Sequence, residues 1–218
     1  IMKNKILFSG RVAPPIHGAA KVNELYFNSS LINEKYKLKK VRINRYDSLK
    51  EIGSFSFKKF IGVFSVFFEL LYQLMFFRPK LVYFEIAPTG FAFYRDSIYV
   101  LLCKIFRRKI LFHFHAKGLD RYLTDHGGTR YYRFVFKNTR AILLSPCLYS
   151  DIKEIFPREK VLILPNGVIN ELTDKEFRKI LIERKNNKIP KLIFLSNMIE
   201  SKGVLDTLKI CNQLNKRN

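Results

Sequence analysis

Two histidines near the middle of the chain have a spacing that suits a ligand site. His113 and His115 flank Phe114 in a run of apolar residues. If this run is a β-strand, the two histidines point to the same face of the sheet. A histidine at the end of a strand can act as a general base or hydrogen-bond a sugar hydroxyl. A purely structural role for the pair is the alternative. No third ligand follows at a suitable spacing, which argues against a metal site.

Further polar side chains follow a second apolar run, at residues 81–86. Glu85 lies near the end of this run, and Thr89 is expected to cap the helix that follows it. Arg95 neighbours Asp96 in that helix, so the two side chains are expected to form an ion pair or a solvated face. If Arg95 points toward a cleft instead, its guanidinium group suits a phosphate.

Two loops that precede helices contain glycine and suit an approach to phosphate. The loop at residues 10–20 includes His17 and Gly18, and its small residues let the backbone approach a ligand beside a helix start. Its Pro-Pro pair makes it stiff and unlike a G-x-G-x-x-G fingerprint, so a plain strand-to-helix turn is the alternative. Lys202 precedes Gly203 at a second helix start, where a lysine opposes the helix dipole unless an anion is bound. Lys202 is therefore a candidate for phosphate binding, with a solvated loop lysine as the alternative.

The elements that must position these residues are short apolar runs separated by longer helical segments. This alternation favours parallel strands in a sheet that is buried on both faces. The predicted fold class is α/β, a doubly wound, parallel, Rossmann-like sheet, whose ligands collect at the carboxyl ends of the strands. The expected strands are residues 5–10, 81–86, 109–115, 141–145 and 161–164.

The composition changes after an Asn-Gly pair, which indicates a second domain. Residues 1–169 are expected to form the first domain, and residues 170–190, rich in Lys, Glu, Arg and Asn, a connector. Residues 191–196 predict a new strand, followed by a loop and a helix. One strand and one helix cannot bury a core. Residues 191–218 are therefore interpreted as the start of a second Rossmann-like domain that is cut short.

Residues 57–77 contain seven phenylalanines and are the strongest candidate for a membrane contact. A spanning helix needs about 20 predominantly apolar residues, and Glu69 with Gln73 inside this segment would be costly. The segment is therefore not expected to span a membrane. It is interpreted as a helix buried against the sheet. The alternative is a helix lying partly in a membrane surface, with the basic residues of 35–50 against anionic headgroups.

The overall composition is that of a folded protein with a strongly basic surface. Of the 218 residues, 48% are apolar and 27% are charged, which excludes a disordered or fibrous chain. There are 40 Lys and Arg against 18 Asp and Glu, giving a net charge of +22. This charge requires an anionic partner: nucleic acid, acidic lipid or a phosphorylated ligand. Three separated cysteines and a start without an apolar signal sequence favour a cytoplasmic location.

In their order along the chain, these motifs resemble the N-terminal domain and interdomain crossing of a family 4 glycosyltransferase of the GT-B fold. The order is a glycine loop, a strand ending in histidine, a Leu-Ser-Pro run at residues 144–146, a Pro-Asn-Gly-Val turn and a strand leading to Lys-Gly. The resemblance covers residues 5–214. Residues 14–19, 90–96 and 113–115 resemble a bacterial branch of the family that builds surface polysaccharides.

The resemblance implies two Rossmann-like domains, the first for the acceptor and the second for a nucleotide-sugar donor. It implies transfer of a hexosyl-type sugar with retention, without a metal ion or cofactor, onto a lipid-linked or saccharide acceptor. An anionic membrane surface at the inner face is an expected partner, and nucleic acid is not. His115 matches the family's active-site histidine, and Lys202 matches the lysine that holds the donor diphosphate. The other candidates are Gly18 and Gly203 beside the donor phosphates, and His17, His113, Glu85, Thr89 and Arg95 on the acceptor side.

The chain departs from the family pattern in two respects. Ser196 and Asn197 stand where the family often has Gly-Arg, so one phosphate-binding cation is missing there. The Glu-x7-Glu element that binds the donor would lie beyond Asn218. Residues 1–218 alone are therefore expected to be inactive or nearly so.

Two functions without catalysis compete with this interpretation. A nucleic-acid-binding module would use the high positive charge and the many aromatic residues. Against it, the aromatic residues lie in apolar runs that look buried, and the basic residues are spread along the chain. A membrane-surface module that keeps the fold without turnover is the other alternative, and Asn197 in place of arginine is its only support.

Overall fold

The computed structural model describes residues 3–12, 18–43, 57–167, 172–186, 192–196, 198 and 200–217. Its contacts divide the chain into two compact units, Ile1–Val168 and Ile169–Asn218. The first unit carries a sheet with the helices that cover it, and the described residues of the second unit carry helical segments.

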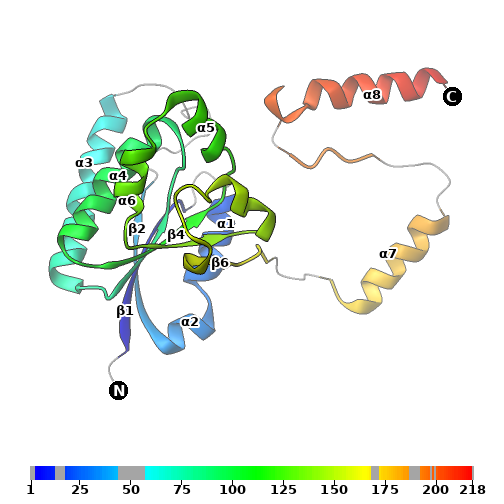
Figure 1. Ribbon diagram of the computed structural model, residues 1–218. Coiled ribbons are helices and arrows are strands. Elements are labelled where there is room, and N and C mark those ends of the chain that lie inside the picture. Colours follow the sequence, from blue (N-terminus) through cyan, green and yellow to red (C-terminus); the bar gives the residue numbers. More distant parts are fainter. Residues whose placement is uncertain are drawn as a thin grey trace. The chain divides into compact units, whose positions relative to one another are not determined.

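Parallel strands form a single six-stranded sheet in the described part of the first unit, in the order β2-β1-β3-β4-β5-β6 (Figure 1). This sheet confirms the predicted doubly wound α/β fold. The chain runs outward from β1 to β2 and returns to the other side of β1 at β3, so the strand order reverses between β1 and β3. The strands are β1 (Asn4–Gly10), β2 (Tyr36–Arg42), β3 (Leu81–Glu85), β4 (Lys109–Phe114), β5 (Arg140–Leu143) and β6 (Val161–Ile163).

The edge strand β2 is the strand that the hydrophobic pattern does not reveal. Its sequence, Tyr-Lys-Leu-Lys-Lys-Val-Arg, interrupts its apolar residues with lysines, and it pairs with β1. Charges of this kind protect an exposed sheet edge from pairing with another chain. The strand forms because β1 offers it hydrogen bonds, and a short basic segment does not contain that information by itself.

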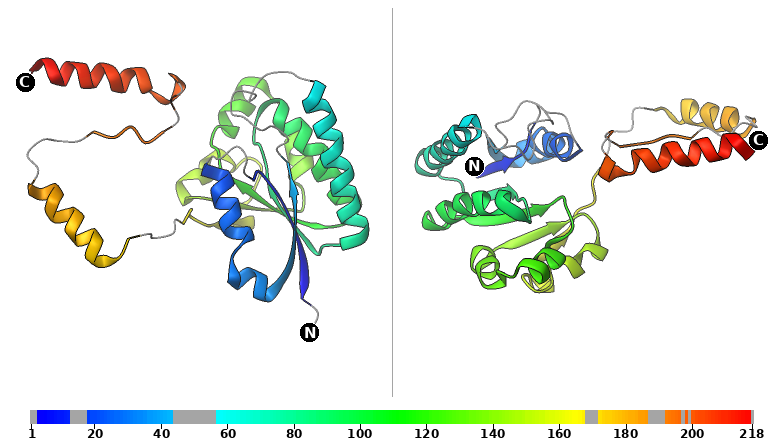
Figure 2. Two further views of the ribbon diagram at one scale, coloured as in Figure 1. Left: turned by 180° about the vertical axis from the view of Figure 1, so that it is seen from behind. Right: turned by 90° about the horizontal axis from the view of Figure 1, so that it is seen from above.

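Helices cover both faces of the sheet (Figures 1 and 2). On one face α1 packs on β1, and its residues Tyr26 and Phe27 close a small core over Phe8 and Tyr83. The helical segments of the unit are α1 (Gly18–Phe27), α2 (Ser30–Lys35), α3 (Phe57–Tyr72), η2 (Gln73–Phe77), α4 (Gly90–Ile105), α5 (Leu119–His126), α6 (Thr129–Phe136), η3 (Pro146–Asp151) and η4 (Arg158–Lys160).

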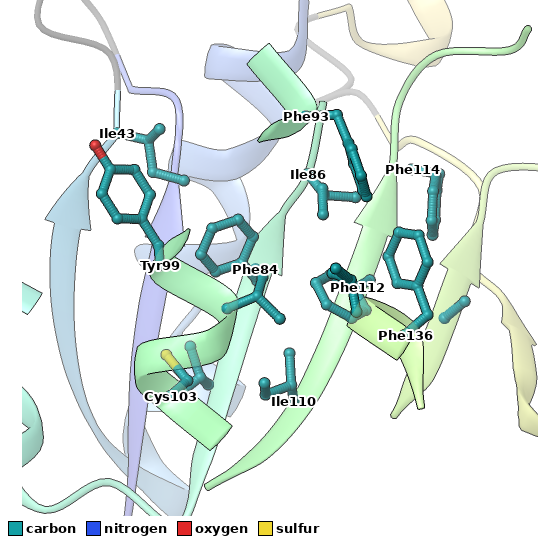
Figure 3. Close-up of a cluster of buried hydrophobic side chains, with 14 of the residues drawn as sticks. Ile43, Phe84, Ile86, Phe93, Tyr99, Cys103, Ile110, Phe112, Phe114 and Phe136 are labelled. Carbon is teal, nitrogen blue, oxygen red and sulfur yellow. The ribbon is translucent and has the colours of Figure 1, made fainter. Parts of the chain in front are cut away.

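The larger core fills the opposite face, between the sheet and helices α3, α4 and α6. Figure 3 shows its aromatic centre, where Phe84 of β3 and Phe112 of β4 meet side chains of α4 and α6. Phe93 of α4 stacks on Tyr132 of α6 with ring centroids 3.6 Å apart. The sheet is thus buried on both faces, as its apolar strands predicted.

Helix α3 and the π-helical turn η2 that continues it are apolar on two opposite sides. The side against the sheet is at most 1% exposed and comprises Val66, Leu70 and Leu74. The opposite side, the outer face of α3, is 49–66% exposed and comprises Phe64, Phe68, Tyr72 and Phe76. The predicted burial against the sheet is therefore confirmed for one side of the helix. Within the described ranges, the structure contains no helix with the length and apolar character needed to cross a membrane.

The second unit consists, in its described residues, of α7 (Asp174–Asn186), the short 3-10 helix η5 (Glu200–Lys202) and α8 (Val204–Arg217). The strand predicted at residues 191–196 is wrong for the described part: residues 192–196 form no strand, and Leu192, Ile193 and Leu195 are exposed. A strand needs a neighbour to complete its hydrogen bonds, and the described residues of this unit supply none. The helix predicted after Gly203 is confirmed by α8.

The two sides of α3 provide a test of the fold. Leu70→Ala is expected to lower the free energy of unfolding by about 2–5 kcal/mol, because it empties a fully buried position. Phe68→Ala, on the outer face of α3, is expected to cost less than about 1 kcal/mol, since its ring is already in water. Urea denaturation followed by circular dichroism measures both losses. Equal losses would contradict the assignment of the two sides.

Candidate functional site

The carboxyl ends of β1 and β3 are neighbours at the point where the strand order reverses. Doubly wound sheets bind their ligands at this point. Glu85 ends β3 there, while Gly10 ends β1 and is followed by Arg11. The predicted candidate Glu85 therefore lies where the topology places a binding site.

Glu85 is the centre of a buried polar cluster, and its side chain is 1% exposed. Its Oε1 pairs with Nη1 of Arg11 at 2.6 Å. Its Oε2 accepts the backbone N–H of Arg11 at 2.7 Å and an amide N–H of Asn23 at 2.5 Å. Asn23 Nδ2 also donates to the carbonyl oxygen of Arg11 at 2.9 Å. The cluster ties β1, β3 and α1 together, and the charges of Arg11 and Glu85 offset each other.

Gly10 leaves room for this cluster. A Cβ atom at this position would lie 3.1 Å from Nδ2 of Asn23 and 3.2 Å from the ring of Phe8. Both distances are tighter than ordinary van der Waals contact, so a side chain here would push α1 away from the end of β1. A glycine is thus needed at position 10 because the side chain of Asn23 approaches the backbone closely there.

The hydrogen bonds continue from Asn23 through Tyr83 to His113. Both Asn23 N–H groups are used on Glu85 and Arg11, so its Oδ1 accepts, and the Tyr83 hydroxyl donates to it at 3.3 Å. Tyr83 Oη also contacts Nδ1 of His113 at 2.5 Å, and the tautomer of the imidazole decides which of these two atoms donates.

His113 is an uncharged, fully buried imidazole. Burial, and then the neighbouring His115, lower the pKa of His113 to about 3. Its Nε2 has no hydrogen-bond partner among the described residues. The His113 ring lies 4.0 Å from the ring of His115 and 5.9 Å from that of Tyr26, measured between centroids. The contact between the two histidines confirms that they share one face of the sheet.

The phenols around His113 are also uncharged. Burial raises the pKa of Tyr26, and burial together with the charge of Glu85 raises the pKa of Tyr83. Each hydroxyl can therefore both donate and accept a hydrogen bond. Next to His113, the first unit therefore presents neutral hydrogen-bonding groups at Tyr26 and Tyr83.

Thr89 and Arg95 belong to a separate cluster at the start of α4. Thr89 occupies the N-cap position, as predicted, but its side chain makes no capping hydrogen bond. Arg95 forms the expected ion pair with the buried Asp96, at 2.6 Å. Asp96 also accepts the backbone N–H of Ala87 at 3.0 Å, which holds the loop after β3. Arg95 is thus engaged by a protein carboxylate.

The predicted phosphate-binding residues are divided between the two units. Gly18 is the first residue of α1, and His17 lies outside the described residues. Lys202 is exposed at the end of η5, and Gly203, with φ at 80°, separates it from α8. Lys202 therefore lies just before the start of a helix, as the sequence predicted. Asn197 lies outside the described ranges.

The start of α5, near the carboxyl end of β4, is occupied by the protein itself. Asp151 accepts the backbone N–H groups of Gly118, Leu119 and Asp120 at 3.0–3.3 Å. This carboxylate takes the place that an anionic ligand would have at the N-terminus of a helix. Among the described residues, no group of three His, Cys, Asp or Glu side chains is arranged to hold a metal ion.

The sequence did not identify Arg11, Asn23 and Tyr83 as members of the site. The position of Arg11 could have indicated a site residue, because it is a charged residue directly after a predicted strand, in the loop at residues 10–20. Tyr83 lies inside an apolar run and Asn23 inside a helix, where neither residue type indicates a site. Only the packing of α1 against the ends of β1 and β3 brings them together.

No protein-family model and no curated protein sequence matches this chain. Among solved structures, it is similar to the crystal structure of MurG from Acinetobacter baumannii, with a TM-score of 0.35 and 8% sequence identity. The match covers 87% of this chain and 50% of that one, so the chain spans about half the length of the MurG structure. A likeness of this degree describes a loose similarity of fold.

The buried His113 makes stability depend on pH. Its pKa is about 3 in the folded chain and about 6.5 when unfolded, so the unfolded chain binds more protons between these values. The contribution of His113 to the free energy of unfolding is therefore fully present above pH ~6.5. It falls as the pH decreases toward 3, by up to about 1.4 kcal/mol per pH unit. His113→Gln is expected to remove this part of the slope, and His126→Gln, at an exposed position on α5, is the control. Denaturant unfolding across this pH range measures the slope, and an unchanged slope in His113→Gln would contradict the burial of a neutral imidazole.

Proposed function

We propose that this chain carries the acceptor-side domain, and the beginning of the donor-side domain, of a family 4 glycosyltransferase of the GT-B fold. The observation that carries the proposal is the polar cluster at the switch point of the parallel sheet, which leads from Arg11 and Glu85 to His113 and His115. The full protein would move a hexosyl group from a nucleotide sugar to a lipid-linked or saccharide acceptor, with retention and without a metal ion. Synthesis of bacterial surface polysaccharide is the process that the sequence motifs favour.

The pairing of the charged side chains supports acceptor binding by the first unit and donor binding by the second. In the first unit, the guanidinium groups of Arg11 and Arg95 are paired with Glu85 and Asp96, and the start of α5 is taken by Asp151. A donor diphosphate needs a cation that can reach it. Lys202 is exposed directly before α8, where the helix dipole adds to its attraction for an anion. We assign Gly18, Lys202 and Gly203 to the donor phosphates and His115 to catalysis at the sugar.

The outer face of α3 supports a second part of the proposal, binding to a membrane surface. Its exposed aromatic rings form a stripe at positions four residues apart. A contiguous exposed apolar stripe is unusual on a soluble protein unless it contacts a partner. Both faces of the sheet are covered by helices, so the described part of the chain does not offer the open aromatic sheet with which RNA-binding modules stack bases.

Cations lie at the C-terminal end of η2, beside the buried ring of Phe77 and not on the outer face of α3. The ammonium groups of Lys5 and Lys39 lie 5.5 Å and 5.3 Å from the ring centroid of Phe77, at the end of η2. Arg78 and Lys80 follow directly and are exposed. Aromatic side chains beside several cations are the combination that anionic lipid headgroups bind. We assign this surface to the anionic inner leaflet, where a lipid-linked acceptor would be presented.

Donor binding is tested in a chain that continues through a complete second domain. One nucleotide sugar is expected to raise its Tm, and Lys202→Ala is expected to abolish the rise because the diphosphate loses its cation. His115→Ala should keep the rise and lose turnover. The matched control is Lys209→Ala, an exposed lysine of α8 that pairs with Asp206. A full shift in Lys202→Ala contradicts the phosphate assignment, and the absence of any shift across the nucleotide sugars contradicts the transferase proposal.

Membrane binding is tested by co-sedimentation of the chain with lipid vesicles. Vesicles rich in phosphatidylglycerol should bind it, and pure phosphatidylcholine vesicles should not. The double variant Phe68→Ser, Phe76→Ser is expected to weaken binding at least about tenfold, because each buried aromatic side chain contributes about 1.5–3 kcal/mol. Phe134→Ser with Phe177→Ser, two exposed phenylalanines elsewhere, is the control pair. Equal loss in both pairs, or tighter and steeply salt-dependent binding to unrelated oligonucleotides, would overturn this assignment.

A further inference from the structure

The amino end of the sheet, opposite the candidate site, carries a row of cations. Lys5 of β1 pairs with Lys37 of β2, and the backbone N–H of Lys80 donates to the carbonyl oxygen of Lys5 at 2.9 Å. Lys109 begins β4 and pairs with Leu81, the residue after Lys80. Four neighbouring strands therefore have a lysine beside their first residues at nearly the same level, at the lower end of the sheet in Figure 1. We call these four residues the lysine row.

The lysine row is not neutralised by the protein itself. Lys37, Lys80 and Lys109 are exposed, and Lys5 is half-buried. In the part of the chain that the structure describes, none of the four forms an ion pair with a carboxylate. Neighbouring strands lie about 4.8 Å apart, where like charges repel, and a sheet has only a small dipole to offset this repulsion. An anionic partner at this end of the sheet would relieve it.

Exposed apolar side chains and two further cations flank the lysine row. Phe76 in η2 is 66% exposed, and Ile105 at the end of α4 is 75% exposed. Each is followed two residues later by an exposed arginine, Arg78 and Arg107. The two helical segments lead directly into β3 and β4, so these side chains lie at the same end of the sheet as the lysine row. A lipid bilayer offers both anionic groups and an apolar layer, whereas the phosphates of a nucleic acid offer no partner to Ile105.

We propose that the amino end of the sheet faces an anionic lipid bilayer, and that the acceptor is the distant end of a lipid-linked chain of several sugars. The lysine row and both arginines contact the headgroups, while Phe76 and Ile105 enter the interface. The first half of the proposal stands on these charges and exposed side chains alone. The second half rests on the proposed function, which supplies a sugar-transferring site at the carboxyl ends of the strands.

The height of the candidate site above the bilayer limits the acceptor. β1 has seven residues, and a strand rises about 3.3 Å per residue, so the carboxyl ends of the strands lie about 20 Å from the lysine row. The outer face of α3 ends at Phe76, so a domain that rests on the edge between this face and the lysine row holds the site away from the bilayer. A single sugar on a lipid diphosphate stays at the headgroups, whereas the end of a longer saccharide reaches the site.

The orientation is tested by reversing charges at opposite ends of the sheet. Lys80→Glu with Lys109→Glu is expected to weaken binding of the full chain to phosphatidylglycerol vesicles at least about tenfold, because two attractive charges become repulsive. Lys21→Glu with Lys117→Glu is the matched control. It changes the net charge equally, but on the first turn of α1 and after β4, at exposed positions near the carboxyl ends of the strands. It should bind nearly as tightly as the wild type.

Co-sedimentation measures both pairs, and circular dichroism checks that each variant folds. If a reversed pair does not fold, glutamine replaces glutamate in all four substitutions, which removes the charges without reversing them. Equal losses in the two pairs would show that net charge alone drives binding, and they would overturn the orientation. Tighter binding of the wild type to an unrelated oligonucleotide than to the vesicles would also overturn it.

Acceptor length is tested with a chain that continues through a complete second domain. Two acceptors that carry one sugar or several sugars on the same lipid diphosphate are anchored in vesicles. The longer acceptor is expected to be used faster. With soluble, short-chain versions of both acceptors, the preference should disappear, because the site no longer has to reach above a bilayer. Equal use of the two anchored acceptors, or a preference that persists in solution, contradicts the inferred acceptor.

These failures are distinguishable from a failure of the proposed function. A wrong orientation leaves the Lys202-dependent rise in Tm intact, together with the loss of vesicle binding in the Phe68→Ser, Phe76→Ser variant. A wrong transferase assignment removes that rise and the turnover of every acceptor. It leaves the difference in vesicle binding between the two lysine pairs as found.

Discussion

The carboxylate of Glu85 joins three elements that are distant in the sequence, and the site depends on it. It binds the backbone and side chain of Arg11 after β1 and the side chain of Asn23 in α1, while it ends β3 itself. A buried carboxylate is stable only when donors surround it, and removing one partner of a buried ion pair typically costs about 3–5 kcal/mol. With its donors in place, Glu85 sets the orientation of the Asn23 amide. The Asn23 amide then contacts the hydroxyl of Tyr83, which in turn contacts Nδ1 of His113.

The strongly basic composition does not translate directly into free cations beside the buried cluster. The net charge is +22, yet the guanidinium groups of Arg11 and Arg95 are paired with the buried carboxylates of Glu85 and Asp96. Exposed cations are found on β2, just after η2 and at Lys117 after β4. Basic charge at a surface therefore favours association with an anionic partner.

Helix α3 is apolar both on the side that packs against the sheet and on the side that is exposed to solvent. Leu70 is buried against the sheet, while Phe68, two positions away, lies on the opposite side of the helix and is exposed. The abundance of phenylalanine in residues 57–77 is compatible with a buried helix and with a surface helix. The sheet decides which side is covered, because the residues that contact it are those at the correct rotation about the helix axis.

The sequence by itself determined the parallel α/β sheet, the strand ends where Glu85, His113 and His115 lie, and the capping position of Thr89. Apolar runs between helices have few other ways to bury both of their faces, so local pattern was sufficient for these features. It did not determine β2, whose lysines conceal a strand that forms only beside β1, and it wrongly predicted a strand at residues 191–196. The contacts of Asn23, Tyr83 and Tyr26 were decided by tertiary structure alone. They form between α1, β3 and β4, and no spacing within one segment encodes which side chains those elements bring together.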